Sequence, residues 1–274
     1  MAIGGFRPNP ITVWGIQPDM ETAPVYRVRV SDEDQQKRRR ELLVILSALS
    51  LKIVHAVDRD AKAIVGALLH LSGEDGVIST ARLYQAKNLI AAQGASLDGV
   101  LSELIIQRFS DAADLGTQLI TGKPHATQVK SAHNAAASIL ALGALGVPVT
   151  DVISTAISQT TQNAEGAISR ATLAGKSVRY AADEIEAAYR SLGTKIAGES
   201  STQINSVFVE AARVVAASDT QVVGFEWRLG ANHNRADICD DLAGYYDKDD
   251  AKLDLLPPHP SCYCWLSPVY REIP

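Results

Sequence analysis

The three cysteines of this chain all lie in its last 36 residues, and a histidine lies among them. Nineteen residues separate Cys239 from His259, two separate His259 from Cys262, and one separates Cys262 from Cys264. Three thiolates and one imidazole are a complete tetrahedral ligand set for zinc, and a loop of this length can close on a compact His-x-x-Cys-x-Cys segment. The spacing therefore predicts a structural zinc site. The alternative is that the cysteines are small buried apolar side chains with His259 hydrogen-bonded nearby.

Other chemistry in the same region has to be weighed against zinc ligation. Three cysteines cannot pair completely within one chain, and neighbours spaced like Cys262 and Cys264 seldom form a relaxed disulfide. His233 and Asp237 could be further ligands, could orient a bound imidazole, or could cap turns. The aspartates after Cys239 lack the alternation and the closing Glu of a calcium loop, so we expect a solvated acidic loop. These aspartates are Asp240, Asp241, Asp247, Asp249, Asp250 and Asp254.

Catalysis is the second possibility for these residues. A cysteine nucleophile with His259, or a nuclease element at His233-Asn234, would need an imidazole held against its partner and a site for the developing charge. His259 instead lies between Pro258 and Pro260, beside cysteines whose spacing suits ligation. We therefore expect no enzyme.

The only dense basic cluster is Lys37, Arg38, Arg39 and Arg40. It could contact DNA or an acidic partner. The alternative is a solvated helix face, because acidic residues between 32 and 41 are interleaved with the basic ones.

The elements that must position these residues are mostly helices. Apolar residues recur at three- and four-residue spacing from Leu42 to Leu68, which predicts one long amphipathic helix, or two nearly collinear ones, starting near Ser31 and ending before Gly73. Further helices are expected at 79–93, 97–115, 127–145, 150–174, 177–192 and 194–218. Glycines lie where these helices would need a left-handed residue to stop. These glycines are Gly94, Gly116, Gly146, Gly175 and Gly193.

The chain divides into three parts. Residues 1–30 contain four prolines and read as an extended arm that ends in a short strand, and 31–220 form the helical body. In 221–274 a period-two pattern at Val223, Phe225, Trp227 and Leu229 predicts a strand with one buried face. The fold class is therefore mainly α: a helical body with an extended N-terminal arm and a small C-terminal strand-plus-loop Cys/His module.

Charge limits the kinds of partner. The net charge of −5 argues against a surface that neutralises DNA phosphates over its whole extent, and 226–274 carries nine acidic and five basic residues. Between Ser131 and Ala164 only Asp151 is charged, so we expect these helices at the bundle centre or, failing that, in an assembly interface. Glycine and proline interrupt 131–150, so no stable membrane insertion is expected. The N-terminus lacks a secretory pattern, which indicates maturation in the cytoplasm where the chain is made.

The C-terminal region resembles a known family. The residues that carry the resemblance are Phe225-Glu226-Trp227-Arg228-Leu229, His233, Asp237-Ile238-Cys239-Asp240, Leu242-Ala243-Gly244 and Pro258-His259-Pro260-x-Cys262-x-Cys264-Trp265. They resemble the C-terminal signature of phage minor head proteins, the head morphogenesis group named after protein F of phage Mu. The preceding helix, 199–215, looks like the polar-then-apolar helix that leads into that module. Residues 1–195 share only a helical character with the family.

The resemblance implies a function for the whole chain. Family members are low-copy minor capsid proteins of the virion, associated with the portal and the inside of the head, which act in head assembly and in DNA packaging or delivery. It implies portal or major capsid protein as the partner here, with packaged DNA and a homo-oligomer as further options. The alternatives are a phage nuclease or hydrolase, and an ejected internal virion protein that contacts the host membrane through 131–150.

Overall fold

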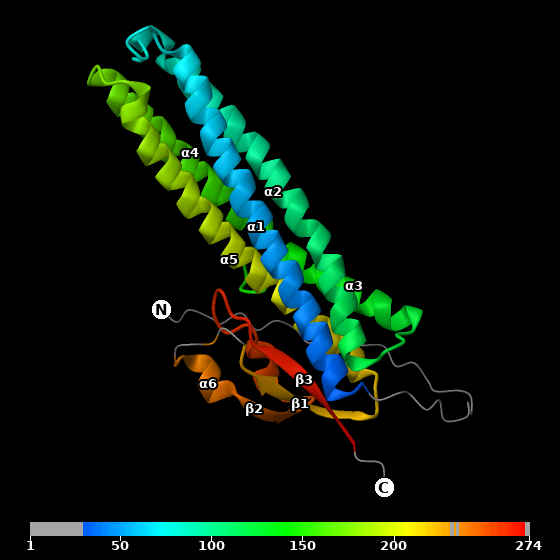
Figure 1. Ribbon diagram of the computed structural model, residues 1–274. Coiled ribbons are helices and arrows are strands. Elements are labelled where there is room, and N and C mark those ends of the chain that lie inside the picture. Colours follow the sequence, from blue (N-terminus) through cyan, green and yellow to red (C-terminus); the bar gives the residue numbers. More distant parts are fainter. Residues whose placement is uncertain (1–29, 231–232, 234–235, 272–274) are drawn as a thin grey trace, which may run out of the picture.

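Long helices and one small sheet make up the part of the chain that the structure describes (Figure 1). This structure is a computed structural model, and it describes residues 30–230, 233 and 236–271. The predicted arm, apart from Val30, lies outside the described residues. The helices are α1 Asp32–Leu71, α2 Leu83–Ile120, α3 Ala126–Leu142, α4 Val149–Leu173, α5 Val178–Ala217 and α6 Ile238–Leu242, with short 3-10 turns at Thr80–Arg82 and Ala251–Leu255. The strands are β1 Val222–Arg228, β2 Gly244–Asp247 and β3 Trp265–Tyr270. The mainly α fold class is confirmed.

The first helix, α1, is a single helix of 40 residues, as one of the two alternatives predicted. Ser31 caps it: the backbone N–H of Asp34 donates to the Ser31 hydroxyl oxygen at 3.1 Å. Its apolar stripe is buried along the whole length. At the far tip of the bundle, the turn after α1 meets the turn before α5, where the N–H of Val178 donates to the carbonyl oxygen of Gly76 at 2.9 Å.

Three predicted helix breaks, at Gly94, Gly116 and Gly193, were wrong, and at the first two the glycine serves packing. α2 runs unbroken through Gly94 and Gly116, and α5 runs through Gly193. A Cβ on Gly116 would lie 2.2 Å from the carbonyl oxygen of Phe208, and one on Gly94 would lie 2.5 Å from the Thr161 hydroxyl oxygen. A glycine at these positions lets two helices approach more closely than any side chain would allow. The predicted stop at Gly175 is confirmed, since this glycine has positive φ just after α4 ends. The stop predicted at Gly146 was misplaced, because α3 ends at Leu142 and its cap is Gly143, which also has positive φ.

The centre of the bundle is α5, and the expectation that the charge-poor helices occupy it was wrong. α5 contacts α1, α2, α3 and α4, and every residue from Ser200 to Val209 is buried. α3 buries only Gln128, Ala132 and Ala136, and α4 buries one stripe. These helices lack charge because they are rich in small and hydroxyl-bearing residues, which do not need a central position.

One helical stretch, Thr80–Ile120, is long and apolar enough to cross a membrane by length and composition alone. Of its most apolar window, 28% is buried inside the described protein. Core helices of soluble proteins meet the same criteria. The stretch differs from the 131–150 segment considered above.

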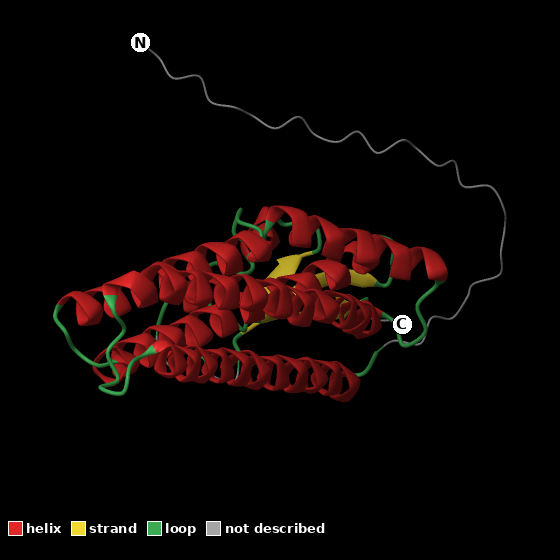
Figure 2. Ribbon diagram, turned by 90° about the horizontal axis from the view of Figure 1, so that it is seen from above, coloured by secondary structure: helices red, strands yellow, loops and turns green. Residues whose placement is uncertain are grey.

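The sheet lies toward one end of the bundle, the end where the described chain begins and ends (Figures 1 and 2). Its order is β2-β1-β3, with both pairs antiparallel. Phe225 and Trp227 are buried as predicted, but a bulge between Val222 and Gly224 turns Val222 inward in place of Val223. Pro268 is accommodated because β3 is an edge strand.

Candidate metal centre

The predicted Cys/His ligands come from two segments that the sheet brings together. Cys239 lies in the first turn of α6, while His259, Cys262 and Cys264 lie in the loop that leads into β3. Asp237 is the N-cap of α6: its carboxylate accepts a hydrogen bond from the N–H of Cys239 at 2.7 Å. Of the roles predicted for Asp237, that of a cap is therefore confirmed. This cap fixes the orientation of the α6 turn, and hence of the Cys239 side chain.

The predicted ligands lie together. The Cys239 Sγ lies 3.2 Å from the His259 Nε2 and 3.7 Å from the Cys262 Sγ. These three atoms form one group that could hold a metal ion, and Cys239 and Cys264 form a second such group with His233. All three cysteines are unpaired by disulfides and buried. Five side chains thus surround one small region, and the set could hold a metal ion.

The ring of His259 is oriented for ligation. Its Nδ1–H donates to the carbonyl oxygen of Pro260 at 2.8 Å, which fixes the tautomer and leaves the Nε2 lone pair facing Cys239. The carboxylate of Asp237 lies 3.3 Å from the same Nε2. His259 therefore presents its free nitrogen to the thiol group.

His233 lies close enough to Cys239 and Cys264 to be a further ligand, one of the roles that the sequence left open for it. Its Nε2 lies 3.0 Å from the Asp240 carboxylate, and that hydrogen bond raises the pKa of His233. Asp240 is therefore part of the site, although the sequence indicated only a solvated acidic loop. Asp241 and Asp249 are exposed, as that interpretation predicted.

The thiols differ strongly in acidity. Hydrogen bonding from Cys262 lowers the pKa of Cys264 to about 6, with help from the backbone N–H of Gly230 and from Cys239. Burial raises the pKa of Cys239 to about 12, and the hydrogen bond to Cys264 together with burial raises that of Cys262. The protein therefore stabilises one thiolate with two neighbouring thiols, and a cation placed among them would favour the ionised form of all three.

A buried polar contact fixes this loop to the helical body. The side-chain N–H of Asn205 on α5 donates to the carbonyl oxygens of Cys262 at 3.3 Å and Cys264 at 2.9 Å. Arg39 on α1 donates to the Asn205 side-chain oxygen at 2.7 Å and to the carbonyl oxygen of Tyr263. Burial lowers the pKa of Arg39 to about 10, against the opposing effect of the nearby Cys264 thiolate, so the guanidinium stays charged at neutral pH.

Three further contacts tie the module to the bundle. The N–H of Ser261 donates to the Thr202 hydroxyl oxygen at 2.6 Å. The remaining two contacts are Ser267 to Gln35 at 2.6 Å and Arg228 to Asp32 at 2.9 Å. Sequence reasoning missed all these positioning residues, although the polar run at 199–206 inside a predicted helix is a usable signal, because no amphipathic pattern explains it.

The basic cluster divides into buried and exposed members. Arg39 is only 4% exposed, so the prediction that it contacts DNA or a partner was wrong: its charge serves an internal contact. Arg38 pairs with Glu41 at 2.9 Å, as interleaved charges predicted. Lys37 and Arg40 are exposed, so contact with DNA or an acidic partner stays a prediction for these two residues.

In comparisons with known proteins, no family model, no curated protein and no solved structure matches this chain.

Proposed function

We propose that this protein is a structural minor head protein of a tailed phage, made in the host cytoplasm and incorporated into the virion, where it binds the portal or the major capsid protein. The C-terminal residues that resemble the phage minor head family support the proposal. They are the residues of β1, of α6 and of the Cys/His loop, so the resemblance covers one structural unit rather than scattered positions.

The observation that carries a structural role is the closed character of the Cys/His set. Cys239, Cys262 and Cys264 are at most 2% exposed, and the loop that bears two of them is tied to α5 because the Asn205 side chain donates hydrogen bonds to the carbonyl oxygens of Cys262 and Cys264. Structural zinc sites have four protein ligands, whereas catalytic sites keep one position open for water or substrate. The proposed ion is zinc, held by the three thiolates and His259, with Asp237 and His233 beside it.

Zinc content is the first test of this proposal. We expect one zinc per chain in protein purified without chelator, measured by elemental analysis. Cys262→Ser and His259→Ala should lose it, while His233→Ala should keep it, because the Nε2 of His233 bonds to Asp240. Metal-free protein of unchanged stability would remove the zinc assignment.

The virion role is tested separately. Mass spectrometry of purified particles should find the chain at low copy number, and cross-linking should join it to portal or capsid subunits. Absence from particles, with zinc still bound, would contradict the virion role alone. Replacing the exposed Lys37 and Arg40 with glutamine tests contact with packaged DNA, since loss of DNA retention in otherwise normal particles is expected if they serve it.

A hydrolase is the rival function that one observation favours, namely the 3.2 Å approach of Cys239 to His259. Burial of Cys239 and its raised pKa are the reverse of what activates a nucleophile. Nuclease or peptidase activity that disappears in Cys239→Ser, with folding retained, would support the rival.

A further inference from the structure

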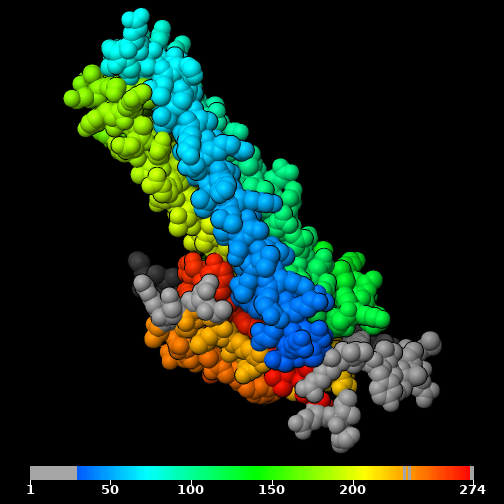
Figure 3. Space-filling model, viewed as in Figure 1, coloured from blue at the N-terminus to red at the C-terminus, as the bar shows by residue number. Residues whose placement is uncertain are grey.

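The outer face formed by α1 and α2 has exposed apolar side chains along much of its length. In Figure 3 the two helices run side by side along the visible face of the bundle. Val44 is 68% exposed and Leu51 is 62% exposed, large fractions for aliphatic residues, and Val100 is 38% exposed. Exposed apolar groups that follow one groove indicate a contact surface rather than scattered surface residues.

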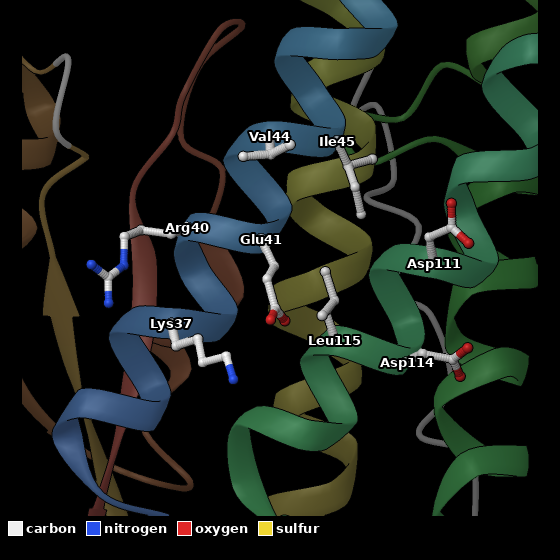
Figure 4. Close-up of a pocket in the computed structure, with 8 residues that line it drawn as sticks. All are labelled: Lys37, Arg40, Glu41, Val44, Ile45, Asp111, Asp114 and Leu115. Atoms are coloured by element: carbon white, nitrogen blue, oxygen red, sulfur yellow. The ribbon is translucent and has the colours of Figure 1, made fainter.

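Two hollows lie along this face, one after the other. The first encloses about 690 Å³ and has an apolar floor that includes Ile45 and Leu115 between the two helices (Figure 4). The second encloses about 660 Å³ and is lined by Leu51, Ala56, Val100 and Leu104 among others. Together they form one groove, which we call the α1/α2 groove.

The two edges of the groove carry opposite charges. Figure 4 shows Arg40 pointing away from α2, and Asp111 and Asp114 pointing away from α1, at the same level of the bundle. Farther along, Lys52 and Arg59 line the second hollow from α1. Glu41, paired with Arg38 at 2.9 Å, is the one acidic residue among those that line the two hollows from α1, against Lys37, Arg40, Lys52 and Arg59. From α2 the charged lining residues are Asp111, paired with Arg108 at 2.7 Å, and Asp114, paired with His133 at 2.8 Å. The α1 edge is therefore basic and the α2 edge is acidic.

Two copies of this face can pack on each other with a two-fold axis that runs either along the helices or across them. Only one of these two axes brings the basic edge of each copy onto the acidic edge of the other. An axis parallel to the helices places α1 of one copy on α2 of the other, so that Arg40 faces Asp111 and Asp114 of the partner subunit. An axis across the helices would place α1 on α1 and bring like charges together, which costs several kcal/mol. The charges on the two edges therefore favour the two-fold axis parallel to the helices.

The size of the face suffices for a stable dimer. From Lys37 to Arg59 the α1 edge spans about 33 Å, and two adjacent helices are about 20 Å wide. The face then covers about 650 Å² per copy, which puts the interface near the lower end of the roughly 1,200–2,000 Å² total of specific complexes. The apolar floor and the paired charges match the usual arrangement of an apolar centre with a polar rim.

We propose that a second copy of this chain packs on the α1/α2 groove as a two-fold dimer, with its axis parallel to the bundle. Leu51 of each copy lies against Val100 of the partner subunit at the centre, and the charged edges pair at the Arg40 end. The dimer does not depend on the zinc site, which lies on the loop before β3.

Oligomeric state in solution tests the dimer. Light scattering or sedimentation of the full chain should give about twice the monomer mass of 29.3 kDa. Leu51→Glu should weaken dimerisation by about a hundredfold, because it places a charge in the apolar centre. Leu173→Glu is the matched control: Leu173 is 75% exposed but lies on α4, so the dimer should be unchanged.

Charge reversal tests the orientation of the axis. Arg40→Glu and Asp114→Arg should each weaken the dimer, and the chain with both changes should recover it, since each copy then supplies the reversed partner. A chain that stays monomeric at every soluble concentration would overturn the proposal. So would a dimer that Leu51→Glu leaves intact, or single reversals that have no effect. Circular dichroism of each variant separates weakened association from misfolding.

Discussion

Arg39 on α1 donates a hydrogen bond at 2.7 Å to the side-chain oxygen of Asn205 on α5, a residue 166 positions away in the chain. Because Asn205 also holds the carbonyl oxygens of Cys262 and Cys264, the two side chains link the first helix, the central helix and the Cys/His loop. The order of the module therefore depends on residues outside it.

Removing Arg39 should destabilise the protein much more than removing an exposed arginine. Arg39→Ala leaves the Asn205 oxygen and the Tyr263 carbonyl without their buried donor, so we expect the free energy of unfolding to fall by about 2–4 kcal/mol. Arg179→Ala, at an exposed position on α5, should change it by less than about 0.5 kcal/mol. Urea unfolding followed by circular dichroism measures both, and equal effects would show that the buried contact contributes little.

A methyl group at Gly116 should disrupt the packing of α2 on α5. Gly116→Ala places its Cβ 2.2 Å from the Phe208 carbonyl oxygen and 2.9 Å from the Ala211 Cβ, so the helices must separate. We expect a loss of at least about 2 kcal/mol, as for overpacked cores. Gly99→Ala, on the same helix with open space around it, should stabilise by about 0.5–1 kcal/mol. Thermal unfolding should thus shift in opposite directions for the two variants.

Stability should fall as pH rises through the range in which Asp60 ionises. Burial raises the pKa of Asp60 to about 6 in the folded protein, with Arg59 opposing the shift, whereas the unfolded value is 3.8. The folded state holds its proton more tightly between these values, so raising the pH costs stability until the carboxyl is fully ionised, near pH 7. Because Asp60 is only half-buried, we expect Asp60→Asn to gain no more than about 1 kcal/mol at pH 8. Urea unfolding at pH 5 and pH 8 checks this, and a variant with the pH dependence of the original chain would exclude Asp60 as its source.

Metal removal should change the module before the bundle. Trp227 and Trp265 lie in β1 and β3 next to the Cys/His loop, while nearly all the helix lies in α1 to α5. Chelator should therefore shift tryptophan fluorescence at a concentration that leaves the helical circular dichroism signal nearly unchanged. Trp14→Phe removes the remaining tryptophan as background. Loss of both signals together would mean that the bundle cannot fold without the module.

The helical elements could be predicted from the sequence because apolar periodicity is a local signal. The pattern from Leu42 to Leu68 corresponds to one buried stripe of α1. The errors came from glycines, which stop helices in many chains. Here Gly94 and Gly116 lie inside a continuous helix and allow close helix contacts that only the tertiary structure reveals. β2 and β3 were not predicted as strands, because their few residues pair with β1 and have little pattern of their own.

The candidate site was partly predictable for a related reason. Residue type and spacing were enough to group Cys239, His259 and Cys262, which the structure brings together. They also named His233 as a possible further ligand, but they could not indicate that Asp240 bonds to it or that Asn205 fixes the loop. Those contacts depend on how the module packs on α5. Packing between segments that are distant in the chain produces no periodic pattern in the sequence, so it could not be predicted.

The far tip of the bundle is the turn where Gly76 meets Val178, and the described chain begins and ends at the opposite end. A helix of 40 residues is about 60 Å long, so the bundle acts as a stiff spacer of that length. A fluorophore attached near Ser31 or Arg271, where the described chain begins and ends, would leave the tip free to engage a second molecule. Energy transfer between a dye at the tip and one near the chain ends would then report bending of the rod directly.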